Sequence, residues 1–146
     1  MEIASTNQEI KLEVGVKAFI TNSDGKYLVL KKAKPYHGLT ECMWDIPGGR
    51  INPGEPLAEA LAREIKEETQ MEMTGTPEVI FAQDILRVEG RHVVRLTYLT
   101  DAKGDIILDG KEHTESKWVD ISELVSLYHD KYLDPVIPLL KNGKPG

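Results

Sequence analysis

The sequence contains little cysteine, no long apolar run and few positive charges. Cys42 is the only cysteine among 146 residues, so no intrachain disulfide can form, and one cysteine with four scattered histidines does not make a zinc site. No apolar run approaches the ~20 residues that a membrane-spanning helix needs. The first residues carry no basic stretch followed by an apolar run, so no secretory signal is expected. These absences predict a soluble, cytoplasmic protein without a membrane partner.

Negative charge exceeds positive charge, with 24 acidic against 18 basic residues, a net charge of −6 and a pI near 5.2. A nonspecific binder of a nucleic-acid polymer needs a basic surface, so that class is excluded. Small nucleotides remain suitable ligands because a bound metal ion can reverse the local field. The length and 40% hydrophobic content fit one domain over residues 1–146, of which 1–10 are polar and expected to be flexible.

Most of the periodic segments are typical of strands. Apolar residues alternate over residues 12–20, which is typical of a strand, and residues 22–25 are typical of a turn. Residues 26–31 are expected to form the returning strand, so this region predicts a hairpin. A short strand around Trp44 and Ile46, a second hairpin formed by 78–88 and 91–100, and a strand over 116–119 are also expected. A helix is predicted over 120–128 and a short one within 131–140. This pattern favours an α+β or layered α/β/α domain.

The remaining segment, residues 49–71, reads GRINPGEPLAEALAREIKEETQM and contains the main candidate catalytic side chains. Pro56 suits the first position of a helix, because its fixed φ is already helical. At roughly 100° per residue, Glu64, Glu67 and Glu68 lie on one helix face, where three like charges repel one another. A hard divalent cation with oxygen ligands would compensate them. The fixed positions of the stretch are Gly49, Glu55, Arg63, Glu64, Glu67 and Glu68.

This spacing, preceded by the lead-in WDIPGG at 44–49, resembles the Nudix box of the Nudix hydrolase (MutT-like) family. The resemblance implies an α-β-α sandwich around a mixed sheet and a metal-dependent pyrophosphohydrolase that needs Mg²⁺ or Mn²⁺. Its substrate would be a nucleoside diphosphate linked to another moiety, cleaved by attack of water on phosphorus. A homodimer is a further implication, since dimers are common in the family.

The resemblance also assigns roles to individual residues. Glu67 and Glu68 would be metal ligands, Glu64 a further ligand or the general base, and the backbone carbonyl of Gly48 or Gly49 another ligand. Arg63 would orient these carboxylates, and Glu55 would hold the loop to the helix. Which acid is the base stays open at this stage.

One position of the box departs from the family pattern, which has Gly where this chain has Gln70. A Gln in the left-handed region costs on the order of 1 kcal/mol. Either Gln70 adopts that conformation, or the helix continues until Gly75 ends it. Neither outcome moves the carboxylates.

A carboxylate near the end of the domain is the next candidate. The segment EHTESKW at 112–118 resembles a loop that often supplies one, so Glu112 is expected to be a ligand or base. Glu115 is a weaker candidate, and His113 is weaker still because a single His in a surface loop is usually solvated. Tyr36, Arg87 and Arg91 are the candidate contacts to substrate, since Arg offers a bidentate fork to phosphate.

Two other functions stay open. One is a sanitising pyrophosphohydrolase that converts a modified (d)NTP to its monophosphate. The family's ADP-ribose and dinucleoside polyphosphate groups often show a Pro or a Tyr some fifteen to eighteen residues beyond the box, and residues 86–89 hold neither, which weakens both of those assignments. The other is a noncatalytic nucleotide-binding regulatory domain. Such a domain would be expected to lose some of the box carboxylates, all of which are present here.

Overall fold

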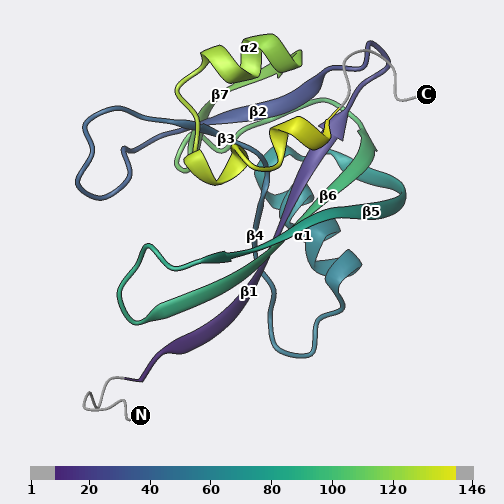
Figure 1. The fold of residues 1–146 in the computed structure, drawn as a ribbon. Coiled ribbons are helices and arrows are strands. Elements are labelled where there is room, and N and C mark those ends of the chain that lie inside the picture. Colours follow the sequence, from purple (N-terminus) through teal and green to yellow (C-terminus); the bar gives the residue numbers. More distant parts are fainter. Residues whose placement is uncertain (1–8, 141–146) are drawn as a thin grey trace.

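The computed structural model describes residues 9–140, which form one mixed sheet with helical segments on both faces (Figure 1). The elements in chain order are β1 (Lys11–Thr21), β2 (Tyr27–Lys32), β3 (Trp44–Asp45), β4 (Gly48–Arg50), α1 (Leu57–Thr69), β5 (Glu72–Ile85), β6 (Arg91–Lys103), β7 (His113–Val119), α2 (Ile121–Ser126) and the 3₁₀ turns Lys131–Leu133 and Ile137–Leu139.

The sheet is mixed because β1 and β6 run parallel, whereas the other pairs are antiparallel. Its main path is β3-β2-β1-β6-β5, with β4 paired to β1 and β7 paired to β2. Two partners therefore share one edge of β1: β4 pairs with residues 15–17, and β2 begins pairing at Thr21. This arrangement brings the glycine turn of β4 beside the middle of β1.

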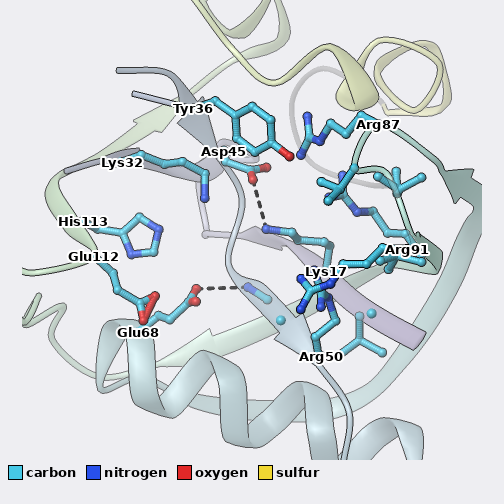
Figure 2. A pocket seen from close by; sticks show the side chains of 18 residues that line it. Lys17, Lys32, Tyr36, Asp45, Arg50, Glu68, Arg87, Arg91, Glu112 and His113 are labelled. Atoms are coloured by element: carbon cyan, nitrogen blue, oxygen red, sulfur yellow. Dashed lines mark hydrogen bonds and ion pairs between the residues drawn. The ribbon is translucent and has the colours of Figure 1, made fainter. Parts of the chain in front are cut away.

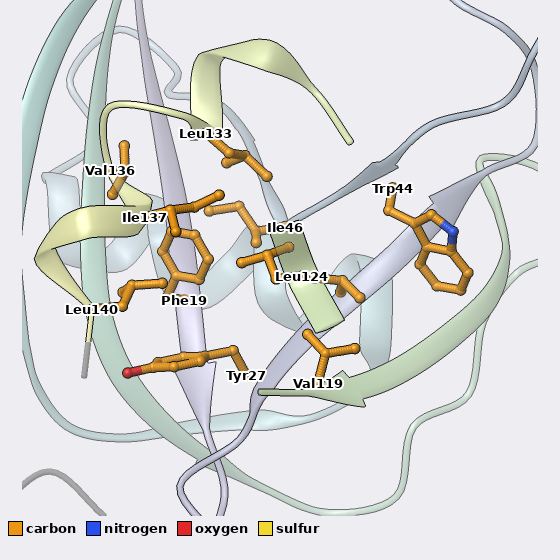
Figure 3. Packing of buried hydrophobic residues seen from close by; sticks show 11 residues of the cluster. Phe19, Tyr27, Trp44, Ile46, Val119, Leu124, Leu133, Val136, Ile137 and Leu140 are labelled. Atoms are coloured by element: carbon orange, nitrogen blue, oxygen red, sulfur yellow. The ribbon is translucent and has the colours of Figure 1, made fainter. Parts of the chain in front are cut away.

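Alternation along β1 assigns its side chains to two cores, as expected for a strand buried on both faces. Val16, Ala18 and Ile20 pack with Leu61 and Ile65 of α1. Phe19 points to the other face, where the C-terminal segments pack (Figure 3). The predicted α-β-α sandwich around a mixed sheet is confirmed.

The second predicted hairpin is present, whereas the two strands of the first are joined by the predicted turn but pair only at Thr21 and Tyr27. The side chain of Asn22 accepts hydrogen bonds from the N–H groups of Asp24 and Lys26 and so closes the first turn. The second joins β5 to β6, and β5 begins at Glu72, earlier than the predicted residue 78. The ladder has register shifts between Thr74 and Glu78, which explains why the alternation is broken there.

Helix α1 begins one residue later than predicted, because Pro56 is extended and caps the helix instead of starting it. It ends at Thr69, and Gln70 adopts φ 65° with its N–H bonded to the Lys66 carbonyl. The alternative in which the helix continues to Gly75 is therefore wrong. Gln70 accepts the left-handed conformation that a Gly would adopt without strain.

Three predicted boundaries near the C-terminus need correction. Strand β7 starts at His113, not at residue 116, because it pairs with β2 along its length. Helix α2 stops at Ser126 because the following segment runs beside β3, where Trp44 donates to the Tyr128 carbonyl. The helix expected within 131–140 is two 3₁₀ turns, and Pro138 lies in the second.

Within residues 9–140, no helix has the length and apolar character needed to cross a membrane. Residues 1–8 of the segment predicted to be flexible lie outside the described residues, whereas Glu9 and Ile10 are exposed and belong to no element.

Candidate active site

A cavity of about 320 Å³ lies on the sheet face that also carries Phe19, at the end left open by the C-terminal segments. This volume is at the lower end of the range for small-molecule sites. Its wall combines strands β1, β4, β6 and β7 with the loop after β2 and the β5–β6 turn (Figure 2). The ionisable side chains in the wall, apart from Tyr36, are Lys17, Lys32, Asp45, Arg50, Glu68, Arg87, Arg91, Arg95, Glu112 and His113.

The glycine turn brings α1 against this cavity. Gly48 has φ 151° and lies so close to β1 that an added Cβ would be 2.1 Å from the Val16 carbonyl oxygen. An added Cβ on Gly49 would be 2.5 Å from the Glu64 carboxylate. Two residues without side chains are therefore what allows the helix carboxylates to approach the backbone of β4.

Arg63 holds three of the box carboxylates. Its guanidinium donates to Glu55 at 2.7 Å, to Glu64 at 3.0 Å and to Glu67 at 3.2 Å. Glu55 also accepts from the N–H of Asn52, and these two donors lower the Glu55 pKa to about 2. The geometry therefore fits the orienting role expected for Arg63 and the structural role expected for Glu55.

Glu68 is the helix carboxylate that lines the cavity. Its Oε1 accepts from the N–H of Gly48 at 3.1 Å, and its carboxylate lies beside Glu112 (Figure 2). Ligand atoms of Glu68, Glu112 and His113 all lie within 4.8 Å of one another. Two carboxylates and an imidazole at this spacing fit a divalent cation such as Mg²⁺ or Mn²⁺, since Mg²⁺ takes carboxylate oxygens and Mn²⁺ also accepts a nitrogen ligand.

Burial sets the protonation of this group. It raises the pKa of Glu68 to about 7, against the opposing effects of Lys17 and the Gly48 N–H. Burial, with Lys32 and Lys17 nearby, lowers the pKa of His113 to about 4. At neutral pH His113 is therefore uncharged and can offer a lone pair, and a cation placed here would favour the charged carboxylate of Glu68.

The other predicted ligands lie differently. Glu64 and Glu67 are held by Arg63 and are absent from the described cavity wall, and the Glu67 side chain is 57% exposed. Burial raises the pKa of Glu64, an effect that Arg63 opposes. Glu115 points away and pairs with Lys31 at 3.6 Å. Direct ligation by Glu64, Glu67 and the Gly48 carbonyl remains a prediction.

Basic groups line the rest of the cavity. Lys17 donates to Asp45 at 3.0 Å and to the Ile46 carbonyl at 3.1 Å. Burial opposes the charge of Asp45, but Lys17, Lys32 and Arg95 outweigh it and keep its pKa below the ordinary value. Burial and the charge of Lys17 lower the Lys32 pKa. This side of the cavity therefore suits an anion.

The three predicted substrate contacts, Tyr36, Arg87 and Arg91, all line the cavity. Arg87 is not simply solvated, as an arginine beside a hairpin turn usually is, because it binds the buried carboxylate of Asp130 through two nitrogens at 3.1 and 3.0 Å. Its guanidinium carbon also lies 4.3 Å from the Tyr36 ring centroid and 4.8 Å from that of Tyr132. Arg87 therefore holds the Tyr36 ring at the cavity wall, and contact of Arg87 with substrate remains a prediction.

Sequence reasoning gave too little weight to several residues. The expectation that His113 is solvated is wrong: the residue is 6% exposed, because β7 pairs with β2 and carries it into the sheet. Lys17, Lys32 and Asp45 were missed altogether. The signal for Lys17 and Asp45 was present, since each is a charged residue in a largely apolar strand segment, where an unpaired charge would be costly.

Comparison with known proteins adds an independent finding. The NUDIX domain model matches residues 11–140. An ADP-ribose pyrophosphatase of Methanocaldococcus jannaschii is 30% identical over 76% of this chain and 64% of its own length. The nucleoside triphosphatase NudI of Escherichia coli is 30% identical over 73% of this chain and 81% of its own.

A solved structure, the MutT protein of Methanosarcina mazei, superposes with a TM-score of 0.76 and 26% identity over 92% of this chain and 95% of that one. The chain spans 43% and 64% of the length of two curated relatives that it matches. The match to the domain model covers the strands, the box helix and the cavity together. This chain therefore belongs to the NUDIX domain family.

Proposed function

We propose that this protein hydrolyses the phosphoanhydride bond of a nucleoside diphosphate linked to another moiety. Water attacks phosphorus, the bond to the bridging oxygen breaks, and two phosphate-bearing products leave. The observation that carries this proposal is the division of the cavity: Glu68, Glu112 and His113 gather at one side, and Lys17, Arg87 and Arg91 lie away from them (Figure 2). A cation site beside an anion site is what a diphosphate requires.

Glu68, Glu112 and His113 would hold Mg²⁺ or Mn²⁺, which would neutralise charge and acidify the attacking water. Glu68 is kept in place by the Gly48 N–H. Arg63 keeps Glu64 and Glu67 aligned along the same helix, where they add negative charge toward the cation. Lys17, fixed by Asp45 and the Ile46 carbonyl, places its ammonium group where it can contact a phosphoryl oxygen.

Glu112 is the residue that we assign to accept the proton from water, through the carboxylate oxygen that does not ligate the cation. It lines the cavity, and within residues 9–140 its side chain takes part in no salt bridge, whereas Glu64 is engaged by Arg63 and lies outside the cavity wall. Tyr36 and Arg91 contribute to the wall that receives the nucleoside or the second moiety. A general base must be within reach of the water that it deprotonates, and Glu112 meets this requirement better than Glu64.

The second candidate is a sanitising pyrophosphohydrolase that acts on a modified (d)NTP. The excess of cationic groups in the cavity favours it, since a triphosphate carries more charge than a diphosphate linkage. A noncatalytic nucleotide-binding domain has less support, because a module that only binds a nucleotide does not need Glu68, Glu112 and His113 within one coordination sphere.

A product assay in ¹⁸O-labelled water tests the proposal. The protein is incubated with Mg²⁺ or Mn²⁺ and a panel of nucleotide sugars, ADP-ribose, dinucleotides and oxidised dNTPs. The products are separated, and their masses are measured by mass spectrometry. We expect cleavage of at least one class, with one ¹⁸O atom in a phosphate product. If no compound of the panel is cleaved, or if the label enters a carbon-bound hydroxyl group, the proposed hydrolysis at phosphorus is wrong.

Four predictions belong with this proposal: that residues 1–146 form a single domain, that the protein is cytoplasmic, that it forms a homodimer, and that its cation is Mg²⁺ or Mn²⁺. Gel filtration with light scattering addresses the dimer, and parallel assays with the two ions address the metal.

A further inference from the structure

Arg95 is a buried cation that has no hydrogen-bonding partner among residues 9–140. It lies on β6, lines the cavity, and is 8% exposed. Its Nη1 is fully buried and has no hydrogen-bond partner within the part of the chain that the structure describes. Burying a guanidinium nitrogen without an acceptor is costly, so such a group indicates that something outside the chain supplies the acceptor.

The neighbouring cations of the cavity already have acceptors. Lys17 is bound to Asp45, Arg87 to Asp130, and Arg91 and Arg50 to Glu13. Lys32 and Arg95 are different, because neither forms a salt bridge among residues 9–140. The positive charge that remains available to a ligand therefore belongs to these two side chains.

Asp45 does not neutralise them. It is 2% exposed and faces the charges of Lys17, Lys32 and Arg95 together. Its Oδ2 accepts from Lys17 and its Oδ1 from the N–H of Ile46. One carboxylate, with both oxygens engaged, is thus shared among three cations, and the centre of the cavity keeps an excess of positive charge.

The local backbone leaves room above Arg95. Its partner in register on β1 is Gly15, which also lines the cavity and contributes no side chain. An added Cβ on Gly15 would make ordinary van der Waals contacts, 3.4 Å from Val93 and 3.6 Å from the Gly49 carbonyl, so a small side chain would fit beside Arg95 without a clash. The Arg95 guanidinium carbon lies 5.8 Å from the Tyr132 ring centroid, a contact that leaves its N–H groups free to donate.

We propose that Arg95, with Lys32, binds an anionic group that the substrate carries in addition to the scissile diphosphate. This inference rests on the proposed function and narrows its substrate class to nucleotides with a further phosphoryl or carboxylate group. Glu68 and Glu112 lie across the cavity from Arg87 and Tyr36, with Lys17 between (Figure 2). Lys17 is assigned to the diphosphate, which leaves Arg95 and Lys32 for the additional anion. Arg95 acts as a specificity-determining residue whose planar fork matches either anion.

The first test needs no metal and no turnover. Inorganic pyrophosphate and tripolyphosphate are titrated in EDTA, by calorimetry and by thermal unfolding, into the wild type, Arg95→Met, Arg95→Gln and Lys103→Met. Lys103→Met is the matched control, since it removes one positive charge from the same strand outside this cavity. Arg95→Gln gives a second reading if Arg95→Met does not fold.

We expect the wild type to bind tripolyphosphate more tightly than pyrophosphate. Replacing Arg95 should weaken tripolyphosphate binding by about tenfold, as expected for the loss of a charge-assisted hydrogen bond, and so remove this preference. The ligand-free Arg95→Met protein should unfold at a higher temperature than the wild type, because an unpartnered buried charge is gone. A purely structural Arg95 would give the opposite shift. An unchanged preference in both Arg95 variants, or no tripolyphosphate binding by the wild type, overturns the proposal.

Turnover then identifies the anion. The ratio of kcat/KM is measured for UDP-glucuronate against UDP-glucose, which differ by a carboxylate, and for ATP against ADP, which differ by a phosphoryl group. If the wild type prefers the more highly charged compound of one pair, and Arg95→Met loses that preference through a higher KM, the group that distinguishes this pair is the anion that Arg95 binds. Equal rates within both pairs contradict the proposal. If none of these four compounds and no compound of the wider panel is cleaved, the proposed hydrolase activity is wrong. The titration in EDTA still tests anion binding by Arg95, because it does not depend on turnover.

Discussion

Glu68 combines a buried environment with a pKa near 7, which is unusual for a carboxyl group. The folded protein therefore holds a proton on Glu68 between about pH 4.5 and 7, where the unfolded chain has lost it. By linkage, this contribution to stability is fully present below pH 4.5 and is lost as the pH rises through 7. The same carboxylate is then free to bind a cation.

The first prediction concerns this linkage. In EDTA, Glu68→Gln should abolish the part of the pH dependence that Glu68 causes, and the variant should be more stable than the wild type at pH 8. Urea unfolding at pH 5, 6 and 8 measures the difference between the two proteins. A constant difference across the three pH values would show that Glu68 ionises normally.

The glycine turn gives a second prediction at the same scale. Gly48→Ala should lower the free energy of unfolding by about 3 kcal/mol or more, because the new Cβ would collide with the Val16 carbonyl and φ is 151°. Gly54→Ala is the control, since Gly54 also has a positive φ but nothing within 4 Å, and should cost about 1 kcal/mol. Denaturant unfolding of both variants checks this, and equal losses would refute the close approach.

At the scale of the elements, the end of α1 is strained at Gln70. The third prediction is that Gln70→Gly stabilises the protein by up to about 1 kcal/mol, because Gly adopts φ 65° without the steric cost. Thermal and chemical unfolding at one pH measure the change. A loss of stability would mean that the Gln side chain makes a contact worth more than the strain.

Local patterns predicted the elements well where one segment decides its own structure. The hairpin turn at Asn22, the helix with Glu64, Glu67 and Glu68 on one face, and the glycine turn all follow from short-range rules. Positions that depend on strand pairing were not predictable in this way. The burial of His113 requires β7 to pair with β2, and the Lys17–Asp45 pair requires β1 to lie beside the lead-in of the box.

The same limit explains which site residues were predicted. Glu68 and Glu112, which both line the cavity, were candidates because a family pattern fixes one and a loop resemblance suggests the other. Glu64 and Glu67 share the helix face with Glu68, yet Arg63 holds both away from the described wall. Spacing on a helix predicts a shared face, but a neighbouring cation decides where each carboxylate points.

At the scale of the whole molecule, Arg87 and Asp130 join the end of the long β5–β6 hairpin to the C-terminal segment. Asp130 is fully buried, binds Arg87 through both oxygens and also accepts from the N–H of Tyr132. Tyr36 stacks on the same guanidinium, so three separate parts of the chain meet beside the cavity. The wall of the site and the packing of the C-terminus are therefore coupled.

The fourth prediction tests this coupling. Arg87→Met should cost about 3 kcal/mol, because it leaves a buried carboxylate without its partner. The double variant Arg87→Met/Asp130→Asn should lose clearly less than the sum of the single variants, since no charge is then left unpaired. A double-mutant cycle by urea unfolding gives the coupling free energy, and strict additivity would show that the pair contributes nothing.

The central claim is that Glu68, Glu112 and His113 share one divalent cation, and Mn²⁺ binding measured by electron paramagnetic resonance at pH 8 tests it most directly. We predict that the wild type binds Mn²⁺ with nitrogen coupling from His113. Glu68→Gln should bind at least about tenfold more weakly, and His113→Gln should lose the nitrogen coupling. Equal Mn²⁺ affinity in the wild type and Glu68→Gln, with no nitrogen signal in either, would contradict the account.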